Sequence, residues 1–297
     1  MSLTQKRIIM LCLGALGGAM LWPLILSIQS VQTAFPNYLV FLIVQGMIFG
    51  LIFGSIFGSF EGIVVSSRIK ALKGLLLGAV AGLAAGALGI LLGQHFLFSA
   101  AEGVIKGWKT AEKTGLIIIS GVSWAITGVF VSMIEGLRAN SLRKLMAGLA
   151  GGITGGLLGG ILLEAIRQSN PENSLALLGG LMLFGLSLSA FYTFFENSFS
   201  WGSIKVLNGP LKDKEYLLVK TRMSIGSDPK CDIVLADYAN VKPLHAYISI
   251  KKGKITLTRA DADAKLTVND MTEAEKILRR EDVFSIGNAK FIYGIFV

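Results

Sequence analysis

The chain has 297 residues, of which 53% are hydrophobic and 16% are charged, and its mean hydropathy is +0.64. Soluble domains carry about 25% charged residues, so this composition excludes a wholly soluble protein and indicates contact with lipid. The formal net charge of +9 does not indicate a nucleic-acid partner, because lysines and arginines that flank membrane helices serve to orient them.

Long apolar runs dominate the N-terminal part of the chain. Residues 8–60 contain no Asp, Glu, Lys or Arg, whereas charges recur every few residues after Trp201. A bilayer core needs roughly 20 apolar residues per helix. Six runs of suitable length predict six spans, at residues 8–29, 38–60, 74–100, 115–134, 145–163 and 175–195. We therefore expect a six-helix transmembrane domain at 1–197, a linker at 198–202 and a soluble domain at 203–297.

Basic residues predict how the spans are oriented. Eight of them fall in segments that share one side of the membrane, against four in the remaining connections. The eight are Lys6, Arg7, Arg68, Lys70, Lys73, Arg138, Arg143 and Lys144. Because positive residues are retained on the cytoplasmic side, we expect both termini to be cytoplasmic, in a multi-pass protein of a bacterial inner membrane.

Glycines recur at every fourth position in three of the predicted spans. They are Gly46, Gly50, Gly54, Gly58 and Gly62; Gly74, Gly78, Gly82 and Gly86; and Gly148, Gly152, Gly156 and Gly160. Residues four apart share one helix face, and such faces let helix backbones approach closely in lipid. The pattern predicts a glycine zipper, either within the chain or between copies in a homo-oligomer. A path or groove for a substrate is the less favoured interpretation.

The even-numbered spans end alike, in Glu61, Glu135 and Glu196. This pattern and the 74-residue spacing of the glycines predict three tandem helical hairpins of common design. The three carboxylates are then expected at the cytoplasmic face of the bundle. They could bind a cation or form a gate, but we favour pairing with nearby basic side chains. Ion-coupled transporters place charged residues inside their spans, and the middle of each predicted span lacks them.

Short runs rich in Val, Ile, Thr and aromatic residues follow Ser203. They occupy residues 204–207, 216–219, 223–225, 233–235, 247–250, 255–258, 266–268, 277–278 and 291–296. Such runs, separated by Gly, Asp, Asn and Pro, predict an all-β sandwich. Asn208-Gly209 and Lys252-Gly253 are hairpin signals.

Four segments of this part resemble the motifs of forkhead-associated (FHA) domains, in order and at the expected spacing. They are residues 225–235, residues 241–246, Val268-Asn269 and residues 282–287. The resemblance covers about a third of the chain. It implies a sandwich that binds phosphothreonine peptides through loops at one end.

The resemblance also identifies the positions of the binding residues. The family's phosphate-binding arginine and serine fall at Ser227 and Lys242, and its peptide-binding Asn-Gly falls at Ala264-Lys265. His245, which supports the loops in the family, is retained. A serine does not supply the bidentate cation of an arginine, so the recognition set is largely replaced. The expected partner-binding residues are Ser227, Lys230, Lys242, His245 and Asn269.

These features predict a membrane-anchored scaffold that recruits a cytoplasmic protein partner without strict dependence on phosphothreonine. The alternative is a channel or transporter regulated through its FHA-like domain. We do not expect an enzyme, a cofactor or a metal site, because the sequence has two histidines, two scattered cysteines and no phosphate-binding loop.

Overall fold

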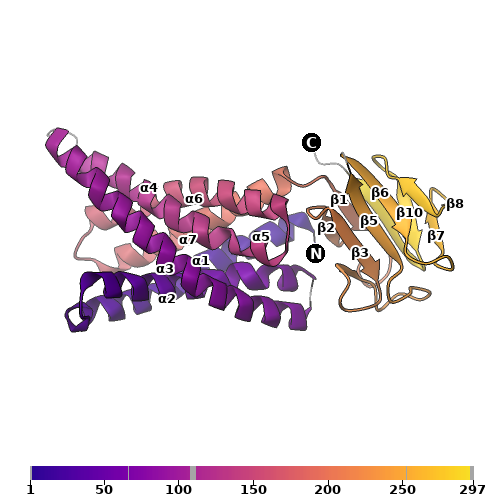
Figure 1. The fold of residues 1–297 in the computed structure, drawn as a ribbon, viewed down its shortest axis with the longest axis horizontal. Helices are drawn as coiled ribbons and strands as arrows, with labels where there is room; N and C mark the ends of the chain where they lie inside the picture. Colours follow the sequence, from indigo (N-terminus) through magenta and orange to yellow (C-terminus); the bar gives the residue numbers. More distant parts are fainter. Residues whose placement is uncertain (1, 66, 108–111, 252, 295–297) are drawn as a thin grey trace. The chain divides into compact units, whose positions relative to one another are not determined.

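The chain divides into two compact units, one helical and one built from strands (Figure 1). The computed structural model describes residues 2–65, 67–107, 112–251 and 253–294. Lys6–Ser198 forms the helical unit, and Phe199–Val297 forms most of the other. One of the two predicted hairpin signals is Lys252-Gly253, and its first residue, Lys252, lies outside the described residues.

Long α-helices make up the first unit. In chain order the elements are α1 (Leu3–Ser30), η1 (Gln32–Ala34), α2 (Tyr38–Val65), α3 (Arg68–Gly107), α4 (Glu112–Ser132), α5 (Ile134–Arg138), α6 (Leu142–Ser169) and α7 (Ser174–Ser198). Within the described residues, six segments are long and apolar enough to cross a membrane: Leu3–Ser30, Tyr38–Val65, Arg68–Glu102, Thr114–Arg138, Leu142–Ser169 and Ser174–Ser198. The prediction of six spans is confirmed, and the chain is a multi-pass membrane protein.

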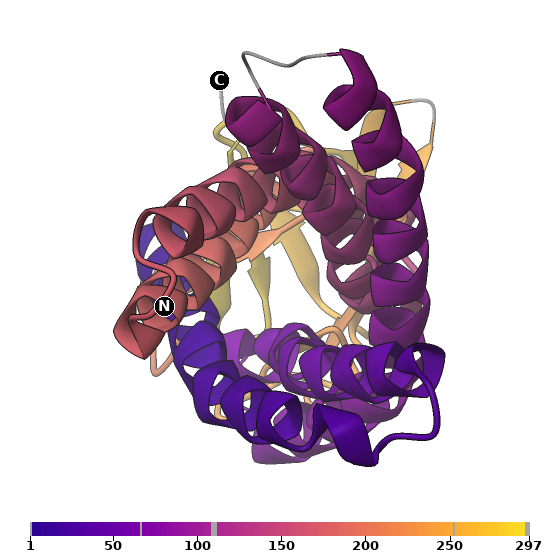
Figure 2. The same cartoon turned by 90° about the vertical axis from the view of Figure 1, so that its left-hand side faces the viewer.

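The two ends of the helical unit are distinguished by the helices that begin and end there. At the end that we call the ionic end, α1 begins, α2 ends and α6 begins. At the other, the open end, α1 ends, α2 begins and α6 ends. Figure 2 looks at the open end, with α6 and α7 on one side of the view, α3 and α4 on another, and the α1–α2 connection on a third.

Glycines bring α2 and α3 into direct backbone contact. A Cβ atom on Gly50 would overlap the carbonyl oxygen of Gly82, and one on Gly54 would overlap that of Gly78. Close van der Waals contact of this kind is what holds helices together in lipid. These two glycine faces are therefore occupied within one chain.

The same contact recurs 74 positions further along the chain. A Cβ atom on Gly62 of α2 would overlap the backbone of Ala71 in α3, and one on Gly136 of α5 would overlap that of Leu145 in α6. A third close contact joins α1 to α7, because a Cβ atom on Gly14 would overlap the backbone of α7. These contacts join spans of different predicted hairpins, and the threefold repeat itself stays a prediction.

The second unit is a sandwich of two sheets. Its strands are β1 (Ser203–Val206), β2 (Glu215–Leu217), β3 (Arg222–Gly226), β4 (Ile233–Val234), β5 (Ala246–Lys251), β6 (Lys254–Arg259), β7 (Leu266–Val268), β8 (Met271–Thr272), β9 (Glu275–Ile277), β10 (Val283–Ile286) and β11 (Ala289–Gly294). One sheet has the order β2-β1-β11-β10-β7-β8, and the other β4-β3-β5-β6-β9. The pairs are antiparallel except β3 with β4, where Ile225 lies opposite Ile233. The prediction of a helical membrane bundle followed by an all-β sandwich is confirmed.

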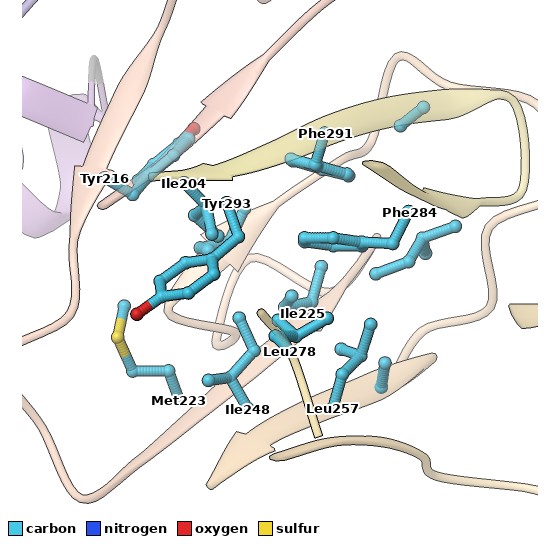
Figure 3. Packing of buried hydrophobic residues seen from close by; sticks show 14 of the residues in the cluster. Ile204, Tyr216, Met223, Ile225, Ile248, Leu257, Leu278, Phe284, Phe291 and Tyr293 are labelled. Carbon is cyan, nitrogen blue, oxygen red and sulfur yellow. The ribbon is translucent and has the colours of Figure 1, made fainter. Parts of the chain in front are cut away.

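Alternating apolar residues of the two sheets form the core of the sandwich (Figure 3). Phe284 and Phe291, on neighbouring strands of one sheet, stack with ring centroids 5.0 Å apart. Ile225 and Ile248 come from the other sheet, and all four side chains are buried. Full burial of one such side chain contributes about 1.5–3 kcal/mol. This core holds fixed the strand ends from which the loops emerge.

Candidate functional site

Two adjacent loops of the sandwich are tied together through their backbones. The N–H of Ser227, just after β3, donates to the carbonyl of Lys242 at 3.0 Å, and the N–H of Asp228 donates to that of Pro243 at 3.1 Å. A Cβ atom on Gly226 would overlap the carbonyl oxygen of Pro243, so this approach requires glycine. Two of the predicted binding positions, Ser227 and Lys242, are therefore neighbours.

His245 is buried behind these loops, with 1% of its surface exposed. Its Nδ1 accepts the N–H of Lys242 at 3.2 Å, and its Nε2 lies 3.0 Å from the carbonyl oxygen of Lys265. Because Nδ1 accepts, the proton of the neutral ring sits on Nε2 and is donated to Lys265. The imidazole thus connects the two segments from behind, which is the supporting position that the FHA resemblance implies.

Lys242 is engaged in an ion pair. Its Nζ lies 2.7 Å from Oδ2 of Asp261 and 3.8 Å from Oδ2 of Asp263. The hydrogen bond and the charge of Lys242 lower the pKa of the Asp261 carboxyl. The Lys242 side chain is 34% exposed and that of Asp261 is 55% exposed, so water screens the pair. An anion that binds Lys242 nevertheless competes with Asp261 for the charge of the ammonium group.

Lys230 lies in the turn that follows Ser227. The backbone N–H of Lys230 donates to the side chain of Asp228 at 2.7 Å, and its own side chain is exposed. The adjoining Cys231 is buried, with its Sγ 3.3 Å from the carbonyl oxygen of Pro243. The turn therefore presents a cation to solvent next to Ser227.

A hollow of about 650 Å³ lies beside Lys242 and His245. Lys265, Thr267 and Ser285 also line it. These residues come from the segment before β7 and from strands β7 and β10. The hollow is lined by basic, acidic, amide and hydroxyl side chains, so it offers both hydrogen-bond donors and acceptors.

Asn269 does not lie with the other four predicted residues. It follows β7 at the end opposite to Lys265, and it lines a separate hollow with Arg279 and Asp282. Its Nδ2 donates to Oδ1 of Asp282 at 2.9 Å, and its Oδ1 accepts the N–H of Val283 at 3.0 Å. With φ at +48°, Asn269 opens the β7–β8 turn. The three-residue strand keeps it at the other end of the sandwich.

The three glutamates of the helical unit meet at the ionic end. Lys144 is the shared cation: its Nζ lies 2.6 Å from Glu135, 3.5 Å from Glu61 and 3.7 Å from Glu196. The side chains of Glu135, Glu196 and Lys144 are exposed by 0%, 1% and 5%. Buried charges of this kind are stable only when paired.

Three further groups complete this ionic cluster. Arg138 lies 2.7 Å from Glu61, and Lys6 lies 2.7 Å from Glu196. Tyr192 donates its hydroxyl to Glu135 at 2.9 Å. Among the described residues, these ion pairs join the three carboxylates to Lys6, Arg138 and Lys144.

The sequence did not lead us to predict that Lys144 is the cation shared by the three glutamates. It entered only as a charge that orients the membrane spans. Its position nine residues after Glu135 across the α5–α6 turn was the available signal, since that turn places both side chains at the ionic end. Among the described residues, no group of three or more His, Cys, Asp or Glu is arranged to hold a metal ion.

Residues 205–294 match the family model described as the inner membrane component of T3SS, cytoplasmic domain. The match covers under a third of the chain, and it leaves out the helices. The C-terminal domain resembles FHA domains in its sequence motifs, and it is a two-sheet sandwich. The expectation that the chain is not an enzyme agrees with this match.

Several solved structures are similar to the chain. The FHA domain of a Chlamydia trachomatis protein is 24% identical, with a TM-score of 0.30 over 32% of this chain and 97% of that one. A Synechocystis protein is 23% identical, with a TM-score of 0.29 over 32% and 95% of the two chains. The cytoplasmic domain of the T3SS sorting platform protein PscD from P. aeruginosa is 20% identical, with a TM-score of 0.28 over 31% and 77%. No protein with curated annotation matches the chain.

Proposed function

We propose that this protein is a scaffold of a bacterial inner membrane, whose FHA-type domain binds a cytoplasmic protein partner without strict dependence on phosphothreonine. Six spans anchor the chain. The basic loop residues counted above support a cytoplasmic position for both termini. The match to the cytoplasmic domain of an inner-membrane T3SS component supports the same placement.

The state of Lys242 is the observation that carries this proposal. Ser227 stands at the position of the family's phosphate-binding arginine, and Lys242 is already paired with Asp261 at 2.7 Å. A phosphate gains most from bidentate charged hydrogen bonds, which this pair of residues does not supply. A partner that uses the loop backbones, Lys230 and the hollow beside His245 fits the geometry better.

The arrangement of the glutamates supports a scaffold over a channel or transporter. Glu61, Glu135 and Glu196 are each paired with a cation, which gives the ionic cluster a structural role. Reconstituted protein is therefore expected to show no ion flux in liposomes. A flux that depends on the chain would favour the channel instead.

Partner binding is tested with the immobilised full-length protein and cell lysate, before and after phosphatase treatment. Lys230→Glu is the test variant, and Arg280→Glu is the matched control, since it reverses an exposed charge near the Asn269 end of the sandwich. We expect a partner that survives phosphatase, is lost with Lys230→Glu and is retained with Arg280→Glu. Loss of the partner after phosphatase treatment would contradict the proposed independence from phosphothreonine.

A further inference from the structure

A pocket of about 480 Å³ lies among the open ends of the helices. Its lining comes from α1, η1, α2, α3, α4, α6 and α7, so every membrane span contributes. Figure 2 views this end of the unit, with the helices arranged around its centre. Pockets that bind small molecules are typically 300–1,000 Å³ in volume.

Aromatic rings form the floor of this pocket. Phe49 and Trp124 line it, and their ring centroids lie 5.7 Å apart. Phe184 packs against both, at 5.7 Å from Phe49 and 5.0 Å from Trp124. Phe53, which is fully buried, continues the cluster toward the ionic end. The pocket therefore ends on flat apolar surfaces.

Amides and hydroxyls without partners line the wall. Gln45 of α2, Gln94 of α3, and Ser120 and Ser123 of α4 all face the pocket. Ser120 and Ser123 are 8% and 5% exposed. None of these four side chains forms a hydrogen bond with another side chain or backbone group in the described residues. Gln45 and Gln94 are half-buried, so these groups face the hollow and keep their hydrogen-bonding capacity for what fills it. Their convergence on one hollow favours a polar occupant.

The charges of the pocket are already neutralised. Glu164 is 7% exposed, and its two oxygens accept from Nε of Arg167 at 3.1 Å, from Nη2 of Arg167 at 2.9 Å and from Nε2 of Gln168 at 2.8 Å. This pair leaves no net charge to attract an ion. The groups left to bind a ligand are amides, hydroxyls and aromatic rings.

We propose that the pocket binds an uncharged solute with several hydroxyl groups and a flat apolar face, for which a saccharide ring is the model. The apolar face would lie on Trp124 and Phe49, since aromatic side chains provide large flat contact surfaces. The amides of Gln45 and Gln94 offer both donors and acceptors to hydroxyl groups. This site is independent of the proposed scaffold function, because it involves none of the sandwich residues.

The test uses the full chain in nanodiscs of dioleoylphosphatidylcholine. Trp22, Trp108 and Trp201 are replaced by Phe, so that Trp124 reports alone, and its emission is followed during titration with maltose. We expect a saturable change. Gln45→Leu and Gln94→Leu should each weaken the apparent affinity by about threefold to tenfold, the value of one lost hydrogen bond. His95→Leu is the matched control, because His95 adjoins Gln94 but is exposed outside the pocket, and its affinity should be unchanged.

Three results would overturn the proposal. One is the absence of any response to maltose. Another is a response that is equal in the two glutamine variants, the control and the parent protein. The third is quenching of Trp124 by brominated phosphatidylcholine that maltose does not relieve, which would show that a lipid chain occupies the pocket.

Discussion

At the scale of single residues, the sandwich and the helical unit use charge in different ways. Lys242 and Asp261 form a solvent-accessible pair, which is screened by water and contributes little to stability. Lys144 is buried among three carboxylates, where the loss of one partner leaves charge without compensation. Under the proposed function the first pair acts on binding, whereas the second acts on folding.

The replaced phosphate site should be restorable. Ser227→Arg supplies a guanidinium group that can bind phosphate in a bidentate way, and Asp261→Asn removes the carboxylate that pairs with Lys242. We expect the double variant of the full-length protein to bind a labelled phosphothreonine peptide roughly tenfold or more tightly than the parent, as charged hydrogen bonds contribute about 1.5–3 kcal/mol each. Fluorescence anisotropy measures this, with the unphosphorylated peptide as control. Equal affinities for both peptides would show that other loop residues prevent phosphate recognition.

Lys144→Met should strongly destabilise the helical unit. It removes the cation shared by Glu61, Glu135 and Glu196, and breaking a buried ion pair costs about 3–5 kcal/mol. Thermal unfolding in detergent should show a much lower melting temperature. Lys73→Met, which removes an exposed lysine from α3, is the control and should melt close to the parent. Similar melting of both variants would argue against a structural role for the cluster.

At the scale of secondary-structure elements, glycine spacing determines how the helices pack. The contacts of α2 with α3 need a hydrogen atom in place of a side chain at each crossing point. The runs that predicted the strands fall mostly on observed strands. The runs did not predict two strands. One is β8, because Met271 and Thr272 are both exposed and show no apolar alternation. The other is β10, whose residues entered only within the FHA-like segment 282–287.

Gly50→Ala is therefore expected to destabilise the α2–α3 pair. Its methyl group would overlap the carbonyl oxygen of Gly82, and overpacking of this kind costs about 1–3 kcal/mol. Gly179→Ala on α7 is a suitable control, since a Cβ atom there has no neighbour within 4 Å. Melting temperatures of the two variants in the same detergent give the comparison. Equal melting temperatures would mean that α2 and α3 accommodate the added methyl group without loss of stability.

At the scale of the whole molecule, topology connects the membrane spans with the FHA-type domain. An even number of spans returns the chain to the side on which it began, so the two termini share one side of the membrane. Under the proposed orientation the ionic end faces the cytoplasm, and the pocket at the open end faces outward. A single chain would then have a binding site on each side.

Reporter fusions test that orientation. A green fluorescent protein fused after Val297 should fluoresce, because this reporter folds in the cytoplasm, and alkaline phosphatase at the same position should be inactive. The opposite pattern is expected for a phosphatase inserted at Asn170, between α6 and α7. Active phosphatase after Val297 would reverse the proposed topology and place the sandwich outside.

The sequence by itself determined the features that depend on local pattern. Hydropathy predicts the six spans because lipid requires long apolar helices, and alternating apolar residues predict the sandwich because one face of each strand is buried. The FHA motifs place Ser227, Lys242 and His245 near one another because they stand at fixed positions around the same strands.

Only the tertiary structure decided which distant side chains meet. Lys6 and Glu196 are at opposite ends of the helical unit's sequence, yet they form an ion pair at 2.7 Å. The pairing of Lys242 with Asp261 and the separation of Asn269 from the other loop residues follow from strand lengths and pairing, which local pattern does not specify. The pocket at the open end likewise draws residues from all six spans, and its unpaired glutamines become informative only when packing shows what surrounds them.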